Sequence, residues 1–248
     1  MPIDRILTHL SEQGYYHGYL SLERQDPAEV MLAICRSLGE LYVPEGCDPA
    51  APIIRTAPTW AQRAAPFDRP EAIGWHGDFA THDPDRPELS AVYVTRSDPG
   101  GVGFGAWRLA SVPRVIAKLQ TTHAGLRAFD LLREEPLPFS YADGEPTQWH
   151  FVLRPMPNGA LGLRFYGPSI RRGCMAEYGE VSEPIAAALA ELQKAADHVV
   201  ELVPTRRGSL LVASNWFALH DRLEQTISAV RPNREALLCF VSRQRLAG

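Results

Sequence analysis

The sequence predicts a mainly β domain with flanking helices, arranged as an antiparallel or mixed sheet sandwich. Strand-like segments occur before, between and after a few helical segments. Strands and helices do not alternate in the regular order of a doubly wound parallel sheet. The chain has 248 residues, 45% of them hydrophobic, which is enough to enclose one sizeable core. We therefore expect a single domain over residues 1–248.

Two helices are expected in the N-terminal part of the chain. The first covers residues 3–10. The second begins after Asp26, which can cap a helix, and Pro27, which fits the first turn. Its apolar residues recur at helical spacing up to Gly39: Val30, Met31, Ile34, Cys35 and Leu38. Residues 44–70 are rich in Pro and Ala and are expected to form short strands and irregular segments.

The remainder of the chain alternates between strand and helix patterns. Strands are expected at residues 91–95, 161–166, 209–213 and 235–242. The segment 161–166 alternates like a half-buried strand, and the Asp-Pro-Gly-Gly turn at 98–101 ends the strand before it. A helix is expected to start at Ser111, and another covers residues 182–199, where apolar residues recur at helical spacing.

Charge and targeting patterns exclude several classes of partner. The net charge of -4 provides no basic field for nucleic acid, which proteins bind through clustered Lys and Arg. No apolar stretch is long enough to span a bilayer, so no membrane partner is expected. Residues 1–5 lack the basic stretch and apolar run of a signal peptide, so we expect a cytoplasmic protein. Association into a homo-oligomer stays open.

Cysteine and glycine patterns exclude other kinds of site. The four cysteines show no paired C-x-x-C spacing: Cys35, Cys47, Cys174 and Cys239. Neither a zinc site nor a disulfide framework is therefore expected, and the thiols are expected to be reduced, in or near the core. The usual dinucleotide and nucleoside-triphosphate motifs are absent.

A possible metal site is indicated by His76, Asp78 and the distant His220. Two imidazoles and one carboxylate make the facial triad that holds non-haem iron(II) and leaves coordination positions open. Residues two apart on an extended segment project to the same side, and Gly77 between them keeps bulk away. The alternative is that these histidines are ordinary surface or hydrogen-bonded residues.

Arginines near the C-terminal strand suggest an anion site. Arg231 and Arg234 precede the apolar strand at 235–242. An Arg that enters a strand just beyond the distal His can point into a barrel and pair bidentately with a carboxylate. A salt bridge at the barrel rim is the alternative for Arg234, and a structural hydrogen bond is the alternative for Arg222.

The order of these motifs resembles the taurine dioxygenase and clavaminate synthase-like family of iron(II)/2-oxoglutarate-dependent oxygenases. The matching elements are Leu38-Gly39-Glu40-Leu41, Trp75-His76-x-Asp78, Pro99-Gly100-Gly101, Asn215-x-x-x-x-His220-x-Arg222, and Arg234 fourteen positions after His220 (234 − 220). The interval between the two histidines, 220 − 76 = 144 residues, is also similar. The resemblance implies a double-stranded β-helix, that is, a cupin-like jelly-roll core.

The resemblance also implies a cofactor set and a reaction. Fe(II) would be held by His76, Asp78 and His220, and the distal carboxylate of the co-substrate 2-oxoglutarate by Arg234, with Arg231 as the second candidate and Arg222 as an orienting residue. With O2, such a dioxygenase hydroxylates an unactivated C–H bond of a small molecule, such as an amino acid or a natural-product intermediate, and releases succinate and CO2. Desaturation, epoxidation and cyclisation are alternatives. Asp78 argues against a halogenase, in which a small residue replaces the carboxylate.

The chain departs from the family pattern at two places. Members often have a hydroxyl residue soon after the Gly-Gly turn, where this chain has Val102-Gly103-Phe104-Gly105. The residue that replaces this contact to 2-oxoglutarate is therefore not identified by the sequence. Asp221 occupies a place where a small residue is common.

Substrate contacts are expected from residues near these motifs. Four residues on or after the predicted strand at 161–166 can bind an anionic substrate or form a solvated basic patch: Arg164, Tyr166, Arg171 and Arg172. Three aromatic residues can form a pocket wall or pack in the core: Trp75, Phe79 and Trp107. Residues 79–87 form either a lid or an ordinary surface loop.

Two other functions remain open at this point. One is a jelly-roll dioxygenase that uses the same metal centre without 2-oxoglutarate. The other is a non-catalytic jelly-roll binding protein, in which His76 and His220 are ordinary polar residues. Formation of succinate distinguishes them from the first hypothesis.

Overall fold

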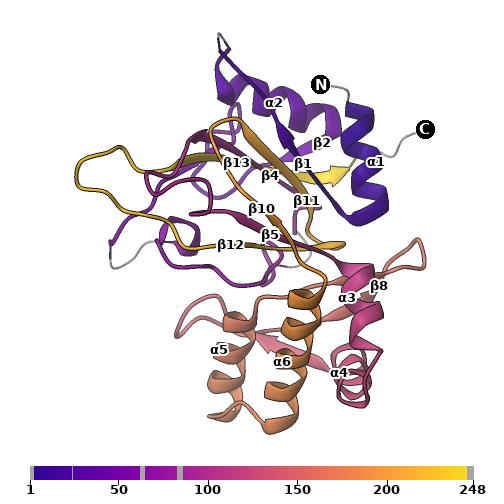
Figure 1. The fold of residues 1–248 in the computed structure, drawn as a ribbon. Coiled ribbons are helices and arrows are strands. Elements are labelled where there is room, and N and C mark those ends of the chain that lie inside the picture. Colours follow the sequence, from indigo (N-terminus) through magenta and orange to yellow (C-terminus); the bar gives the residue numbers. More distant parts are fainter. Residues whose placement is uncertain (1–2, 24, 62–64, 83–85, 245–248) are drawn as a thin grey trace.

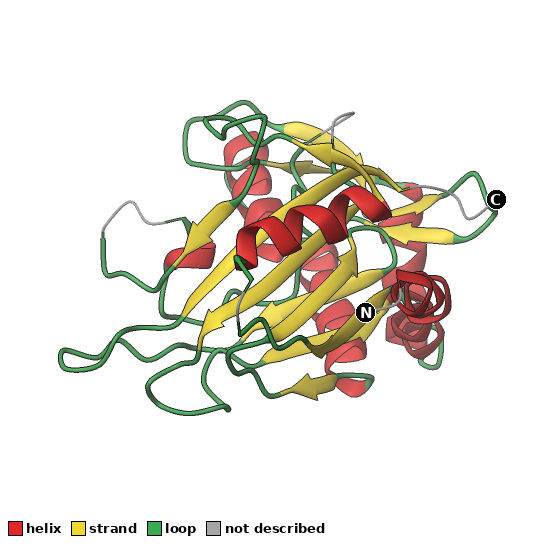
Figure 2. Cartoon of the chain, turned by 90° about the horizontal axis from the view of Figure 1, so that it is seen from above, coloured by secondary structure: helices red, strands yellow, loops and turns green. Residues whose placement is uncertain are grey.

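Two β-sheets packed face to face form the centre of the molecule, and helices cover their outer sides (Figure 1). The structure is a computed structural model that describes residues 3–23, 25–61, 65–82 and 86–244. Helices α1 (Ile3–Gln13) and α2 (Pro27–Leu38) lie on one side of the sandwich. Figure 2 looks down on this side and shows α2 lying across the strands.

The major sheet has six antiparallel strands. Their order is β1 (Tyr15–Tyr19), β11 (Ser209–Ser214), β4 (Leu89–Arg96), β13 (Glu235–Gln244) and β2 (Gly39–Tyr42), with β3 (Ile54–Thr56) also paired to β13. Strand β13 therefore lies inside the sheet, between β4 and β2. Such a position agrees with its nearly continuous apolar sequence, because both of its faces are covered.

The two faces of β13 contact different parts of the core. Leu237, Cys239 and Val241 pack with residues of α1 and α2. Ala236, Leu238 and Phe240 belong to a separate cluster on the opposite face, together with partly buried aromatic and aliphatic neighbours. Alternate side chains of a strand point to opposite faces, so the sequence places one set against the helices and the other toward the second sheet.

The minor sheet carries His220 and pairs with the segment around His76. Its strands are β10 (Glu201–Val203), β5 (Trp107–Ser111) and β12 (Ala218–Arg222), all antiparallel. The segment around His76 extends this sheet, because the His76 and His220 backbones exchange two hydrogen bonds of 2.9 Å. On its other side His76 forms a bridge with Tyr166.

A helical layer covers the outer side of the minor sheet (Figure 1). It contains α3 (Val112–Leu119), α4 (His123–Glu134), α5 (Gly167–Tyr178) and α6 (Glu183–His198). Two small hairpins join it, β6 (Pro136–Phe139) with β7 (Gln148–Phe151) and β8 (Leu153–Pro155) with β9 (Leu161–Leu163). A short 3-10 helix covers Pro66–Asp68.

The structure confirms most of the expected elements and corrects one. Asp26 caps α2 and accepts a hydrogen bond from the Ala28 amide at 2.8 Å, as predicted. A strand is present within the segment 161–166, but β9 ends at Leu163, and the predicted half burial is wrong because residues 162–165 are all buried. Both sides of this segment are covered, so its alternating sequence does not produce alternating exposure. The single domain expected over residues 1–248 stays a prediction.

Among the described residues, no helix combines the length and apolar character needed to cross a bilayer.

Candidate metal and co-substrate site

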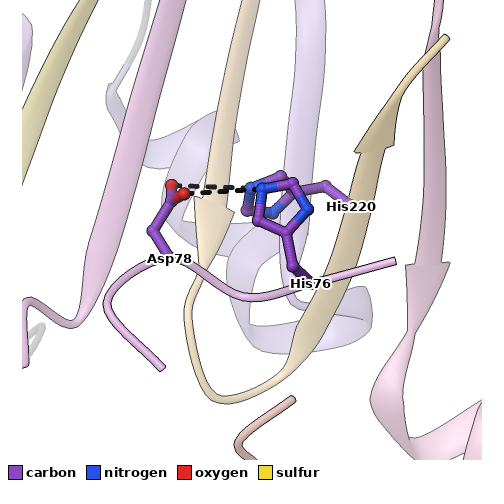
Figure 3. Close-up of side chains that lie close together, drawn as sticks. All are labelled: His76, Asp78 and His220. Atoms are coloured by element: carbon purple, nitrogen blue, oxygen red, sulfur yellow. Dashed lines mark ion pairs between the residues drawn. The ribbon is translucent and has the colours of Figure 1, made fainter. Parts of the chain in front are cut away.

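Three side chains from two distant segments meet on the inner side of the minor sheet (Figure 3). His220 lies in β12, and strand-like pairing places His76 directly beside it. Asp78 follows two residues later in a turn. Its carboxylate oxygens lie 3.5 Å from Nε2 of His76 and 3.5 Å from Nε2 of His220. The structure thus brings together all three residues that the sequence suggested as metal ligands.

The donor set fits a small dication. An ion bound at about 2.1 Å by three ligands on one octahedral face has ligand atoms about 3 Å apart. The three candidate ligand atoms all lie within 4.8 Å of one another, and the carboxylate is closer than that to both rings. Two nitrogens and one oxygen suit non-haem iron(II). In the described part of the chain, no other group of His, Cys, Asp or Glu residues meets the same criterion.

Hydrogen bonding fixes one of the two imidazoles. Nδ1 of His76 donates to the Gly74 carbonyl at 2.7 Å, which leaves the lone pair on Nε2 facing Asp78. Nδ1 of His220 is buried and has no hydrogen-bond partner among the described residues. The orientation of His220 therefore depends on strand pairing and on ring contacts, including an edge contact with His76 at 4.3 Å between centroids.

The electrostatics of the three residues favour an ionised carboxylate. Burial opposes ionisation of Asp78, but the imidazoles of His220 and His76 lower the pKa of its carboxyl well below the ordinary value. Burial opposes a charge on His76, and the hydrogen-bonded Asp78 nevertheless raises the pKa of His76. Burial and the charge of His76 lower the pKa of His220. Asp78 is therefore in the ionised form that can bind a cation, and a bound cation can replace the proton on His76.

Two buried arginines follow His220 in the sequence and lie close enough to each other for their charges to interact. Arg222 is two residues after His220 on β12 and so faces the same side of the sheet. Arg234 immediately precedes β13 and is only 3% exposed. Its Nη1 donates to Oε1 of Gln225 at 3.3 Å, whereas its Nε and Nη2 have no hydrogen-bond partner among the described residues. Sequence reasoning did not identify Gln225.

The two guanidinium groups can accept an anion. Arg222 donates to the carbonyl oxygens of Leu223 at 2.9 Å and Arg69 at 2.7 Å, so neither bond supplies negative charge. Burial lowers the pKa of Arg222 to about 10. Burial and the nearby charge of Arg222 lower the pKa of Arg234 to about 10. A carboxylate placed against the unused nitrogens of Arg234 would relieve both penalties.

The structure separates the two candidate anchor arginines. Arg231 is exposed, and its guanidinium makes a long contact of 3.5 Å to the Pro99 carbonyl. Arg234 lies beneath the glycine-rich loop instead. A Cβ atom on Gly105 would come within 2.9 Å of Cδ of Arg234, so the loop backbone packs directly on this side chain.

Two of the predicted pocket-wall residues lie in the core. Trp75 is buried in the helical-layer core, and its Nε1 donates to Asp197 at 2.8 Å. Trp107 is buried between the two sheets. Phe79 follows Asp78 and packs against Tyr42 and Phe240, with centroids 5.0 Å and 4.9 Å away. Trp75 and Trp107 therefore pack in the core, which was the alternative to a role in the pocket wall.

The predicted substrate-binding residues after β9 have different environments. Arg164 is buried and donates to the carbonyls of Ala80 and His82. Arg171 is exposed. Arg172 donates to the Tyr141 carbonyl at 2.8 Å. Tyr166 makes an edge contact with His76 at 5.9 Å between ring centroids, so it is the member of the group that adjoins the candidate metal ligands.

A cleft of about 330 Å³ adjoins Tyr166. Sequence reasoning did not identify this cleft, because most of its lining comes from an irregular segment without a motif. Its lining residues are Thr59, Trp60, Ala61, Arg69, Pro70, Glu71, Ala72, Ile73 and Tyr166. Ile73 donates its amide to the Arg222 carbonyl at 3.2 Å, so the cleft borders β12 as well as the His76 segment.

No protein-family model matches the chain, and no curated protein matches its sequence. Solved structures do match its fold. Asparagine oxygenase with Fe(II), 2S,3S-3-hydroxyasparagine and succinate matches with a TM-score of 0.74 at 18% identity, over 97% of this chain and 78% of that chain. The non-heme iron oxygenase OrfP with Fe, succinate and (3S)-hydroxy-L-Arg gives 0.66 at 16%, over 96% and 77%.

A third structure has the same fold. PvcB from Pseudomonas aeruginosa, an Fe, alpha-ketoglutarate dependent oxygenase from an isonitrile synthetic pathway, matches with a TM-score of 0.68 at 17% identity, over 97% of this chain and 80% of that chain. These matches confirm the jelly-roll core with flanking helices that the sequence predicted. The chain therefore has the fold of the non-haem iron oxygenases.

Proposed function

We propose that this protein is an iron(II)- and 2-oxoglutarate-dependent oxygenase that hydroxylates a C–H bond of a small molecule. The observation that carries this proposal is the combination of two sites. His220 of the His-Asp-His cluster shares β12 with Arg222, and the charge of Arg222 acts on Arg234, a buried guanidinium with two nitrogens that lack hydrogen-bond partners among the described residues. The fold it shares with iron oxygenases supports the same function.

The residues have distinct roles in this mechanism. His76, Asp78 and His220 would hold the metal on one face, so the opposite positions stay open. When bound, iron(II) supplies the redox chemistry that couples decarboxylation of 2-oxoglutarate to oxidation of a substrate. Arg234 would bind the far carboxylate of the co-substrate and so orient it. The buried surroundings of Arg234 exclude water and strengthen that charge pairing.

The substrate is proposed to enter through the cleft beside Tyr166. Burial raises the pKa of Tyr166, and the positive charges of Arg172 and Arg69 are close enough to oppose that rise. Glu71 lines the same cleft. Positive and negative groups at one opening suit a small zwitterion, that is, an amino acid or a derivative with an anionic group. Structures of the same fold hold hydroxyasparagine and hydroxyarginine, which supports this class.

Three related reactions would use the same residues. Desaturation, epoxidation and cyclisation each begin at the same metal centre, and the Asp78 carboxylate argues against halogenation. The protein is further proposed to act in the cytoplasm on a free small molecule, with neither nucleic acid nor a membrane as partner.

Succinate formation tests the proposed function. Purified protein is incubated in air with iron(II), 2-oxoglutarate and ascorbate, and succinate is measured with and without candidate amino acids. We expect slow succinate formation without substrate, faster formation with the true substrate, and none with His76→Ala. His123→Ala is the matched control, because His123 is exposed on α4 and far in sequence from the cluster.

Metal binding by the same variants separates loss of the site from loss of the fold. His76→Ala and His220→Ala should lose tight iron(II) binding and keep a wild-type circular dichroism spectrum. A wild-type protein that binds metal but makes no succinate would favour a jelly-roll oxygenase without 2-oxoglutarate. One that binds no metal would favour a non-catalytic binding protein.

A further inference from the structure

The turn that carries Asp78 has an unfavourable backbone conformation. Phe79 has φ of 55°, and it is the one non-glycine residue with positive φ among the described residues. Bulky side chains rarely adopt this region, and it persists only where surrounding structure enforces it. Within the turn itself, a hydrogen bond of 3.0 Å joins the His82 amide to the Phe79 carbonyl. Side chains from elsewhere supply further support.

Asn215 and Arg86 hold both backbone polar groups of Asp78. Oδ1 of Asn215, which is fully buried, accepts the Asp78 amide at 3.1 Å. Nε of Arg86 donates to the Asp78 carbonyl at 3.0 Å. The same guanidinium also donates through Nη2 to the backbone carbonyl of Asn215, which joins the Arg86 side chain to the Asn215 main chain. Asn215 is itself fixed, because its Nδ2 donates to the Pro87 carbonyl at 2.9 Å.

Arg164 holds the far end of the same turn. Its Nη1 donates to the Ala80 carbonyl at 3.2 Å and to the His82 carbonyl at 2.8 Å. Arg164 is 1% exposed, so this guanidinium is a buried internal group and not a surface cation available to a substrate. Hydrogen bonds to the carbonyls of Asp78, Ala80 and His82 thus hold the turn at both ends.

One indole supports both arginines. The guanidinium carbons of Arg86 and Arg164 lie 4.5 Å and 5.3 Å from the ring centroid of Trp216. Stacking on an aromatic face restricts a guanidinium to one plane, which directs its donors. Trp216 is held in turn by its carbonyl, which accepts the Leu163 amide at 2.8 Å.

The glycine of the His-Gly-Asp motif fits against this assembly. A Cβ atom on Gly77 would come within 2.6 Å of Nη2 of Arg86 and 3.1 Å of the Asn215 carbonyl oxygen. An alanine there would push the guanidinium away from its acceptors. The close approach of Arg86 therefore requires glycine at position 77. Glycine also leaves space between His76 and Asp78.

We propose that Asn215, Arg86, Arg164 and Trp216 form a clamp that sets the position of the Asp78 carboxylate and so the metal affinity of the site. The inference rests on the proposed function, since it assumes that Asp78 is a metal ligand. The clamp residues are positioning residues. Asn215 and Arg86 bond the backbone of Asp78, Arg164 bonds carbonyls later in the same turn, and Trp216 acts through the two arginines. Groups that orient metal ligands commonly change metal affinity 10- to 100-fold when they are replaced, as an order-of-magnitude guide.

Titration with cobalt(II) alone tests the clamp. The dissociation constant and the visible absorption of bound cobalt(II) are measured for wild type, Arg86→Lys, Arg164→Lys and Gly77→Ala. Lys keeps the charge but loses the planar fork and the stacking. We expect cobalt(II) affinity to fall about tenfold or more in each variant, with a changed absorption spectrum. Arg154→Lys is the matched control, because Arg154 lies 6.0 Å from the same indole without a hydrogen bond to the turn.

Melting temperatures of the metal-free proteins separate positioning from folding. Variants that melt like wild type and bind cobalt(II) more weakly support the clamp. Folded variants with wild-type affinity, or variants that lose affinity only in proportion to the unfolded fraction, overturn it. Gly77→Ala keeps every clamp residue and remains informative if the arginine variants are unstable. A wild-type protein that does not bind cobalt(II) would instead contradict the proposed function.

Discussion

At the scale of single residues, Arg234 combines a high electrostatic cost with unused binding capacity. It is buried beside Arg222, and two of its nitrogens lack hydrogen-bond partners among the described residues. A buried charge without a counter-ion is unfavourable in a folded protein. Burial of this charge therefore carries an energetic cost that a bound dicarboxylate would relieve.

Replacement of Arg234 should weaken 2-oxoglutarate binding selectively. Loss of a buried charged pair commonly costs about 2–5 kcal/mol, which corresponds to at least about a 30-fold rise in KM for Arg234→Met. Arg231→Met should change KM by less than about threefold, because Arg231 is exposed. Steady-state kinetics with varied 2-oxoglutarate measures both. A larger effect at Arg231 would transfer the anchor to that residue.

Substitution of Gly105 should also weaken 2-oxoglutarate binding, because the Gly105 backbone packs on Arg234. Gly105 has φ of 64°, and a Cβ atom there would press on Arg234. Gly105→Ala should raise KM for 2-oxoglutarate without abolishing metal binding. Gly103→Ala is the matched control, since a Cβ at Gly103 meets nothing within 4 Å. Equal KM values for the two variants would show that the loop does not position Arg234.

The sequence predicted which side chains meet at the candidate metal site better than it predicted the walls of a pocket. His76 and Asp78 are two apart, so local geometry alone places them on one side. The choice between Arg231 and Arg234 depends on where β13 begins, which only the paired sheet determines. The sequence pattern predicts Arg164 as a strand residue that can contact substrate. In the structure Trp216, from the distant β11–β12 connection, covers its guanidinium.

At the scale of elements, β12 divides two tasks between its faces. His220 and Arg222 point toward the candidate site, whereas Asp221 points to the other side. Asp221 pairs with Arg108 at 3.1 Å and accepts the Gly74 amide at 2.8 Å. It therefore ties β12 both to the neighbouring β5 and to the segment that carries His76.

Asp221→Ala should destabilise the metal-free protein by about 2 kcal/mol, the size expected for hydrogen bonds to a buried charged group. Chemical denaturation measures this change. Glu191→Ala is a suitable control, because the Glu191–Lys194 pair on α6 involves a lysine that is 71% exposed and should contribute less than about 0.5 kcal/mol. A change below that value at Asp221 would mean that β12 is held by its backbone pairing alone.

Elements with strong local patterns were predictable, and elements stabilised by distant contacts were not. Helix α2 has a cap, an N-terminal proline and an apolar stripe, so its bounds follow from the sequence. Helix α5 contains Gly167, Pro168 and Gly173, which are poor helix formers. Gly173 packs against the Pro138 carbonyl of β6, and this close approach favours a helix that local propensity does not.

At the scale of the whole molecule, the candidate site lies where the two sheets and the irregular segment before His76 converge. The overall fold class was predictable from the number of strands and from the order of motifs. The order of strands in the major sheet was not, because pairing of β13 with β4 joins residues more than a hundred positions apart. Such contacts leave no local signal in the sequence.

Co-substrate binding should stabilise the whole protein. A ligand at 100 times its dissociation constant contributes about 2.7 kcal/mol, or roughly 5–10 °C in melting temperature for a chain of this size. We expect a thermal melt of the wild-type protein in cobalt(II) to show this increase in melting temperature when 2-oxoglutarate is added. Arg234→Met should show little increase when 2-oxoglutarate is added. Without ligand, its melting temperature should be equal to or higher than that of wild type. A full shift in that variant would place the co-substrate elsewhere.

The position of β13 has a consequence for synthesis of the chain. Of the strands in the major sheet, β13 is synthesised last, yet it lies inside that sheet and is preceded directly by Arg234. The nascent protein therefore cannot close the sheet until β13 has emerged from the ribosome, and until then β4 and β2 each present an unpaired edge. Folding of the sandwich and assembly of the candidate anion site are thus expected to finish together, once β13 has emerged.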